Sequence, residues 1–201
     1  MPALENPLWL IGLAGLIGYV LGSVPFGVLM ARLFRLGDLR KVGSGNIGAT
    51  NVLRTGNKAA AALTLGLDAA KGAAAVLLAG WLIGADAAQA AGLAAFLGHL
   101  YPVFLGFAGG KGVATFLGVT LALSLPVGAA ACATWAAVAG YLRYSSAAAL
   151  AAAALAPLWA WAWDVRALIV VLAAMALLIF WTHRGNIGRL AAGIEPKIGR
   201  R

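Results

Sequence analysis

The feature that most constrains the fold of this chain is a series of apolar stretches, most of them close to the length of a membrane-spanning helix. A helix needs roughly 20 apolar residues to cross the hydrocarbon core of a bilayer. Because only 10% of the residues are charged, a water-soluble surface cannot be assembled. The sequence therefore predicts an all-α integral membrane protein, a single polytopic domain over residues 1–201, with about seven helices at 8–34, 57–83, 86–107, 113–125, 126–143, 145–163 and 165–182.

The number of spans has one alternative. The segment 113–125 is too short to cross a bilayer alone, so it either starts deep from a re-entrant loop or merges with its neighbour in a five-span fold. The first apolar stretch follows Glu5 and no basic residue, and it is longer than the apolar part of a secretory signal peptide. We expect it to be a retained helix.

The distribution of positive charge predicts the orientation. With the N-terminus outside and the C-terminus in the cytoplasm, only Lys71 and Arg166 of the 15 basic residues fall away from the cytoplasmic side. The positive-inside rule selects this orientation within an inner membrane, and it explains the net charge of +9 without nucleic acid. Amphipathic indoles favour membrane interfaces, and the tryptophans that flank the apolar stretches are Trp9, Trp81, Trp159, Trp161, Trp163 and Trp181.

In this orientation the three polar, glycine-rich stretches all lie on the cytoplasmic side. They are residues 42–54, 106–115 and 183–197. Glycine lets backbone amides converge on an anion, and arginine offers a forked cationic donor that suits phosphate. We therefore expect one shared site for more than one phosphate group, at a depth that an acyl chain can reach from the lipid.

Each stretch contributes a group of candidates. The second stretch places Lys111 among glycines just before a helix, whose N-terminus favours anions. The candidate site residues are Ser44, Asn46, Thr50, Asn51 and Arg54 in the first stretch; Gly109, Gly110, Lys111 and Gly112 in the second; and His183, Asn186, Arg189 and Lys197 in the third.

Several other interpretations are excluded or less favoured. Gly43-Ser-Gly-Asn-Ile-Gly48 matches a dinucleotide-binding pattern, but that pattern has meaning only between a strand and a helix. The residues around Lys111 lack both the first glycine and the hydroxyl residue of a P-loop. The two histidines, one cysteine and six acidic residues show no metal-ligand spacing.

Three ionisable residues lie inside apolar segments. Asp68 and Lys71 are three residues apart, on one helix face, which favours a self-neutralising structural pair. His99 is interpreted as structural because its segment is largely apolar. An alternative function for the whole chain is transport of a phosphorylated metabolite, although transporters usually contain internal repeats, and none is evident here.

At the three polar stretches the chain resembles the bacterial acyl-phosphate:glycerol-3-phosphate acyltransferases, the PlsY family. The first motif of that family, Ser-Gly-Asn-x-Gly-Ala-Thr-Asn-x-x-Arg, is matched from Ser44 to Arg54. The second is matched from Gly98 to Thr115, except that Ala108 stands where the family usually has lysine. The third, His-x-x-Asn-Ile-x-Arg-Leu-x-x-Gly-x-Glu-x-Lys, is matched from His183 to Lys197, and residues 68–72 also resemble the second helix of the family.

The resemblance implies a seven-helix membrane enzyme that moves an acyl group from acyl phosphate to the 1-hydroxyl of glycerol-3-phosphate, giving lysophosphatidic acid and phosphate. It implies no cofactor, no metal and no acyl-CoA or acyl carrier protein as donor. Ser44, Arg54, Lys111, His183 and Asn186 would be the main catalytic residues. The base that takes the hydroxyl proton is either His183 or a substrate phosphate oxygen, and the oligomeric state is left open, a monomer being compatible.

Overall fold

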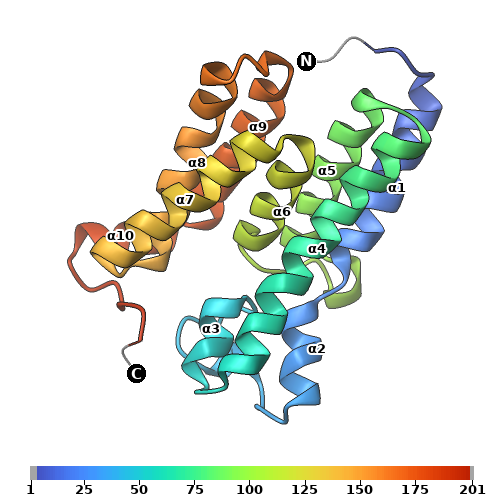
Figure 1. The fold of residues 1–201 in the computed structure, drawn as a ribbon. Helices are drawn as coiled ribbons and strands as arrows, with labels where there is room; N and C mark the ends of the chain where they lie inside the picture. The colour runs from blue at the N-terminus through green and yellow to red at the C-terminus, as the bar shows by residue number, and fades with distance from the viewer. Residues whose placement is uncertain (1–3, 200–201) are drawn as a thin grey trace.

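The computed structural model describes residues 4–199, and within this range the chain is helical, with no strand (Figure 1). Short 3-10 helices lie at Leu39–Lys41, Val103–Leu105 and Arg166–Leu168. The α-helices are α1 (Leu8–Ser23), α2 (Phe26–Leu33), α3 (Ala49–Arg54), α4 (Lys58–Leu82), α5 (Ala85–Leu100), α6 (Val113–Leu123), α7 (Leu125–Leu142), α8 (Ser145–Ala162), α9 (Ile169–Thr182) and α10 (Arg184–Ala191).

The helices that are long and apolar enough to cross a membrane number five in the described part of the chain, or six if a bent pair is counted as one span. The five are 8–33 (α1 with α2), α4, Ala85–Leu105, α7 and α8, and the bent pair joins Arg166–Thr182 to α10 at an angle of 62°. All seven predicted segments are helical. However, α6 has only 11 residues, and it is separated from α7 at Ser124 rather than merged with it as the five-span alternative required.

Two details of the helix prediction were wrong. The first segment is not one continuous helix, because the chain breaks between α1 and α2 at Val24 and Pro25, where proline has no backbone N–H to continue the helix. The polar stretches are not entirely loops, since the first contains α3 and the third contains α10. Both helices are short and only partly apolar, so neither has the long apolar periodicity by which a helix is recognised.

Small residues allow the helices to approach closely. A Cβ atom added to Gly22 of α1 would lie 1.9 Å from the carbonyl oxygen of Ala95 in α5, and one added to Gly118 of α6 would lie 2.0 Å from that of Ala69 in α4. Helix association within a bilayer depends on such close packing, because lipid tails are as apolar as the side chains. A core of larger buried residues, including Phe96, joins α4–α9.

The two ends of the bundle differ in character. Figure 1 places α2, α3 and α10 at one end, whereas the start of α1 lies at the other. Large apolar side chains cover the outside, among them Trp81 and Trp161. Trp159 is less exposed than these, because it packs against the core and its Nε1 donates to Thr134 Oγ1 at 3.1 Å. Arg200 and Arg201, two of the charges assigned to the cytoplasmic side, lie outside the described residues.

Candidate active site

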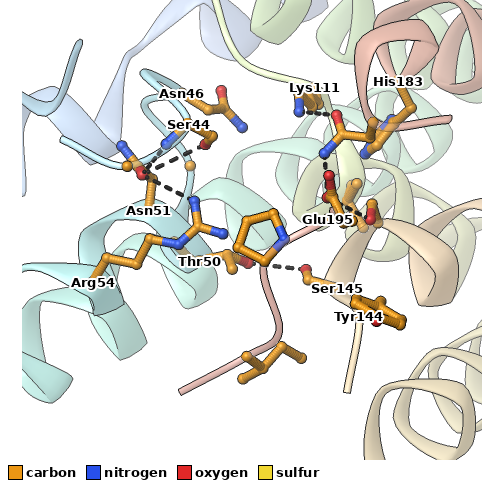
Figure 2. A pocket seen from close by; sticks show the side chains of 18 of the residues that line it. Ser44, Asn46, Thr50, Asn51, Arg54, Lys111, Tyr144, Ser145, His183 and Glu195 are labelled. Atoms are coloured by element: carbon orange, nitrogen blue, oxygen red, sulfur yellow. Dashed lines mark hydrogen bonds between the residues drawn. The ribbon is translucent and has the colours of Figure 1, made fainter. Parts of the chain in front are cut away.

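A cavity of about 1160 Å³ lies where the three polar stretches meet. Figure 2 shows Ser44, Asn51 and Arg54 on one side, facing Lys111 and His183 on the other. The structure therefore brings together residues that are far apart in the chain. The candidates that line the cavity are Ser44, Asn46, Thr50, Asn51, Arg54, Lys111, Gly112, His183, Asn186, Arg189 and Lys197.

Asn51 organises the first side of the cavity. It is almost fully buried, and its Nδ2 donates to the Leu39 carbonyl at 2.9 Å. Its Oδ1 accepts from the backbone N–H of Ser44 at 3.2 Å and from Nη1 of Arg54 at 3.4 Å. Asn51 thus fixes Ser44 and Arg54 relative to one another. Its contacts are those of a positioning residue as much as of a substrate ligand.

Gly43 explains why the first stretch is rich in glycine. Its φ of +52° lies in the left-handed region, which a side chain disfavours. A Cβ atom at this position would also lie 2.7 Å from both Cδ of Arg54 and Oδ1 of Asn51. Glycine here lets the backbone pass directly beside the arginine.

A chain of polar side chains forms the opposite side. Nζ of Lys111 donates to Oδ1 of Asn186, and Nδ2 of Asn186 donates to Oε1 of Glu195 at 2.6 Å. Glu195 also accepts from Oγ of Ser146 at 2.7 Å and pairs with Nε of Arg189 at 2.7 Å. The carboxylate therefore fixes the direction in which Asn186 presents its oxygen to Lys111.

Glu195 was missed as a site residue, although it stands in the third matched motif. It is the only acidic residue in residues 183–197, and a lone carboxylate in a basic stretch was the sequence signal that could have identified it. Burial opposes its ionisation, but the hydrogen bonds from Asn186, Ser146 and Arg189 outweigh burial and hold its pKa below the ordinary value. Glu195 is therefore a charged acceptor at neutral pH.

The environment of Lys111 makes it an easily titrated cation. Burial, together with the positive charges of Arg189 and Arg54, lowers its pKa from 10.5 to about 8, although the negative charge of Glu195 opposes the shift. Lys111 lies immediately before the N-terminus of α6, which begins at Val113 after Gly112. An anion bound there would meet both the ammonium group and the first free amides of the helix.

His183 lies between α9 and α10 and is 3% exposed. Burial and the charge of Lys111 lower its pKa to about 4, so the ring is neutral at pH 7. Nδ1 lies 2.8 Å from the Ile179 carbonyl. Since a carbonyl can only accept, Nδ1 carries the proton in the neutral ring and Nε2 is left as an acceptor.

Gly109 and Gly110 do not line the cavity, contrary to the expectation that their amides form a phosphate seat. The N–H of Gly109 donates to the Leu100 carbonyl and that of Gly110 to the His99 carbonyl, each at 3.1 Å. A Cβ atom on Gly110 would lie 2.3 Å from Nε2 of His99. These glycines instead let the loop lie directly on the end of α5.

Two further regions of the cavity were not selected from the sequence. Tyr144, Ser145 and Ser146 enter from the α7–α8 junction, where Oγ of Ser145 lies 3.0 Å from Oγ1 of Thr50. Their polar run between two apolar segments was the available signal. A more apolar region of the wall lies between α4, α6 and α7 and consists of Leu65, Val113, Leu117, Cys132 and Trp135.

Three further sequence expectations concern the Asp68–Lys71 pair, Ala108 and metal ligands. Asp68 and Lys71 form the expected ion pair, with Nζ 2.8 Å from Oδ1. Ala108 lies outside the cavity lining, and its carbonyl accepts from Nη2 of Arg40 at 3.0 Å. Among residues 4–199, no three His, Cys, Asp or Glu side chains are grouped as a metal site would require.

Comparisons with known proteins agree over the whole chain. The family model described as glycerol-3-phosphate acyltransferase matches residues 12–193. A glycerol-3-phosphate acyltransferase of Jannaschia sp. (strain CCS1) is 66% identical over 100% of this chain and 98% of its own length. One from Ruegeria sp. (strain TM1040) is 62% identical over the full length of both.

Two crystal structures of PlsY (YgiH), an integral membrane glycerol 3-phosphate acyltransferase, have the same fold. The glycerol 3-phosphate form gives a TM-score of 0.88 at 40% identity, over 94% of this chain and 96% of that one. The lysophosphatidic acid form gives 0.84 at 37%, over 94% and 95%. On these matches, the chain belongs to the glycerol-3-phosphate acyltransferase family.

Proposed function

We propose that this protein transfers a fatty acyl group from acyl phosphate to the 1-hydroxyl of sn-glycerol-3-phosphate, giving lysophosphatidic acid and inorganic phosphate. The observation that carries the proposal is the composition of the cavity. Four cationic side chains, Arg54, Lys111, Arg189 and Lys197, share one cavity with an apolar wall. Such a cavity suits two phosphate groups and one acyl chain. Related enzymes captured with glycerol 3-phosphate and with lysophosphatidic acid support the acceptor and the product.

The two sides of the cavity suit the two substrates. Lys111, beside the N-terminus of α6 and next to the apolar wall, binds the phosphate of the donor, whose acyl chain extends between α4, α6 and α7. Arg54 and Ser44, held by Asn51 on the opposite side, bind the phosphate of glycerol-3-phosphate. In the proposed binding mode, the acceptor hydroxyl lies near the acyl carbonyl carbon, between the two anion sites.

The chemical step is a displacement at the carbonyl carbon. The hydroxyl oxygen forms a bond to that carbon, the bond from carbon to the phosphate oxygen breaks, and phosphate leaves with the electron pair. Acyl phosphate is already activated, so orientation and stabilisation of charge are the main needs. Lys111 stabilises the departing phosphate, and Asn186 and Glu195 keep its ammonium group in place.

The proton of the hydroxyl passes to a substrate phosphate oxygen, while His183 orients the hydroxyl through Nε2. A ring whose pKa is about 4 is a weak base at neutral pH. A phosphate monoester has its second pKa at about 6 and accepts a proton more readily. Replacing His183 by asparagine should therefore lower kcat without removing the acidic limb of the pH profile.

Transfer is direct, without an acyl-enzyme intermediate. An acyl-serine mechanism would need a base beside Ser44. The hydrogen-bond partner of its hydroxyl within residues 4–199 is the amide oxygen of Asn51, at 3.5 Å, and an amide is not a base. Incubation with labelled acyl phosphate in the absence of acceptor should leave the protein unlabelled, and a covalent adduct would contradict this step.

The membrane arrangement is also part of the proposal. The chain forms one domain with seven crossings in an inner membrane, the N-terminus outside and the cavity open to the cytoplasm. The charge asymmetry of the sequence supports it. In a Cys132→Ser background, Lys58→Cys should react with an impermeant maleimide only from the cytoplasmic side and Asp164→Cys only from the outer side. Reaction of both from one side would contradict the topology.

The deciding experiment is an assay of purified protein with glycerol-3-phosphate and either palmitoyl phosphate or palmitoyl-CoA. Lysophosphatidic acid and phosphate should form only with the first donor. Arg54→Ala and Lys111→Ala should each lose most of the activity, whereas Lys58→Ala, which removes an exposed cation outside the cavity, should retain it. Product from palmitoyl-CoA would refute the donor, and uptake of glycerol-3-phosphate into liposomes without product would support transport instead.

A further inference from the structure

A buried cluster of ionisable residues lies beside the cavity, inside the helix bundle. Oδ1 of Asp68 lies 2.8 Å from Nζ of Lys71 and 3.6 Å from Nδ1 of His99. All three side chains are about 5% exposed or less. They lie within α4 and α5, in segments that are candidate membrane spans. Ionisable groups at such depth are costly and are retained where they perform a function.

The cluster connects more elements than a self-neutralising pair requires. Nζ of Lys71 also donates to the Val24 carbonyl at 2.8 Å, at the break between α1 and α2, and it lies 5.8 Å from the ring centre of Phe26. The backbone carbonyl of Asp68 accepts from Oγ1 of Thr115 at 2.9 Å, in the first turn of α6. One turn of α4 thus holds both the helix break and the start of α6.

His99 connects this cluster to the loop that carries Lys111. The Gly110 N–H donates to the His99 carbonyl, and its Cα lies so close to the ring that an added Cβ would be 2.3 Å from Nε2. The next residue is Lys111. Asp68 and His99 themselves also line the cavity. A change in the position of the His99 ring therefore shifts the support beneath the lysine.

We infer that Asp68, Lys71 and His99 are positioning residues, whose buried cluster holds the 109–111 loop so that Lys111 meets the phosphate of the acyl donor. This inference rests on the proposed function, in which Lys111 binds the donor. It departs from the purely structural interpretation of the pair, because it assigns the cluster an effect on one of the two substrates. Arg54, which serves the acceptor, lies on α3, and among the described residues it makes no hydrogen bond or ion pair with the cluster.

The test is the effect on the two Michaelis constants in variants that stay folded. His99→Ala removes the ring beneath Gly110 and leaves the Asp68–Lys71 pair intact. The double variant Asp68→Asn/Lys71→Leu removes both charges together, because removing one alone leaves an unpaired buried charge. Each should raise KM for palmitoyl phosphate at least fivefold and keep KM for glycerol-3-phosphate within twofold of the wild-type value. A matched control is Thr120→Val, which removes a buried hydrogen bond of α6 to the Phe116 carbonyl, and it should change neither KM.

A purely structural role gives a different pattern. Loss of stability reduces the amount of active enzyme, so kcat falls while both KM values stay the same. Wild-type-like KM values for both substrates in folded His99→Ala and in the double variant would overturn the inference. Failure of both variants to fold, measured by thermal melting, would identify the cluster as a folding determinant and would overturn it as well. If the wild-type protein makes no lysophosphatidic acid, the proposed function itself has failed.

Discussion

Replacing Glu195 by glutamine tests whether the polar chain behind Lys111 contributes to catalysis. The carboxylate accepts from three donors, on Ser146, Asn186 and Arg189, at 2.6–2.7 Å. Glutamine offers one oxygen and one NH2 group, so at least one donor must face an N–H. A hydrogen bond to a charged group contributes about 1.5–3 kcal/mol, and a buried donor left without a partner costs about 1–3 kcal/mol. We expect a loss of roughly 3 kcal/mol in folding free energy.

Glu195→Gln should also affect catalysis, because Glu195 orients Asn186, which in turn accepts from Lys111. If loss of the Asn186 orientation costs about 1.5–3 kcal/mol in the transition state, kcat/KM falls by about 13- to 160-fold, since 1.36 kcal/mol corresponds to tenfold. The assay is formation of lysophosphatidic acid at pH 7, with thermal melting in parallel. Ionised Glu195 contributes its stability fully above about pH 4.5, and this contribution is lost only as the pH falls through its lowered pKa, so the wild-type group is charged in this assay.

A matched variant separates the two effects. Ser146→Ala removes one donor to Glu195 and leaves Asn186 and Arg189 paired with it. We expect its kcat/KM to stay within about threefold of wild type, consistent with the loss of one hydrogen bond that does not reach Lys111. Glu195→Gln with wild-type activity and an unchanged melting temperature would show that the carboxylate does not orient Asn186.

Three further predictions follow from the geometry. Because the pKa of Lys111 is about 8, kcat/KM should fall as the pH rises through about 8, and Lys111→Arg, which stays charged, should move that limb to higher pH; an unmoved limb would exclude Lys111 as its origin. Ala108→Lys should change KM for palmitoyl phosphate less than twofold, because this position lies outside the cavity lining; a large gain in affinity would contradict the assignment of the donor site. Gly22→Ala should lower the melting temperature by an amount that matches about 1–3 kcal/mol of overpacking against Ala95, whereas Gly12→Ala, with open space around the position, should not.

Hydropathy predicted the helical segments because burial in lipid requires long apolar runs, and that requirement is visible in one sequence. Hydropathy did not locate the break at Val24 and Pro25, since the apolar run continues on both sides. Lys71, which donates to the Val24 carbonyl at the break, is 47 residues away in the chain. The short helices α3 and α10 were missed for a related reason. Each is stabilised by tertiary contacts, such as Asn51 with Leu39, rather than by a long apolar face.

The candidate site was predictable to the extent that its residues share a polar, glycine-rich character and the same predicted side of the membrane. The hydrogen-bond partners of the site residues were not predictable. The sequence predicted that the backbone amides of Gly109 and Gly110 are free to bind phosphate, but their N–H groups donate to carbonyls at the end of α5. In the sequence, Glu195 is only a single acidic residue in a basic stretch, but in the structure three side-chain donors form hydrogen bonds with its carboxylate. Hydrogen-bond saturation depends on neighbours that only the fold supplies.

The balance of charge in the cavity connects the fold to the reaction. Arg54, Lys111, Arg189 and Lys197 share the cavity with two carboxylates, Glu195 and Asp68, and Asp68 is already paired with Lys71. The cavity of the free enzyme is therefore cationic, and repulsion from Arg189 and Arg54 contributes to the low pKa of Lys111. Each substrate phosphate carries a charge of about −1.5 to −2 at pH 7. Two such groups neutralise the excess, and they must then raise the pKa of Lys111 toward its ordinary value. The alkaline limb of kcat, which reports the substrate complex, should therefore lie at higher pH than that of kcat/KM, which reports the free enzyme. Coincident limbs would mean that neither phosphate lies beside Lys111.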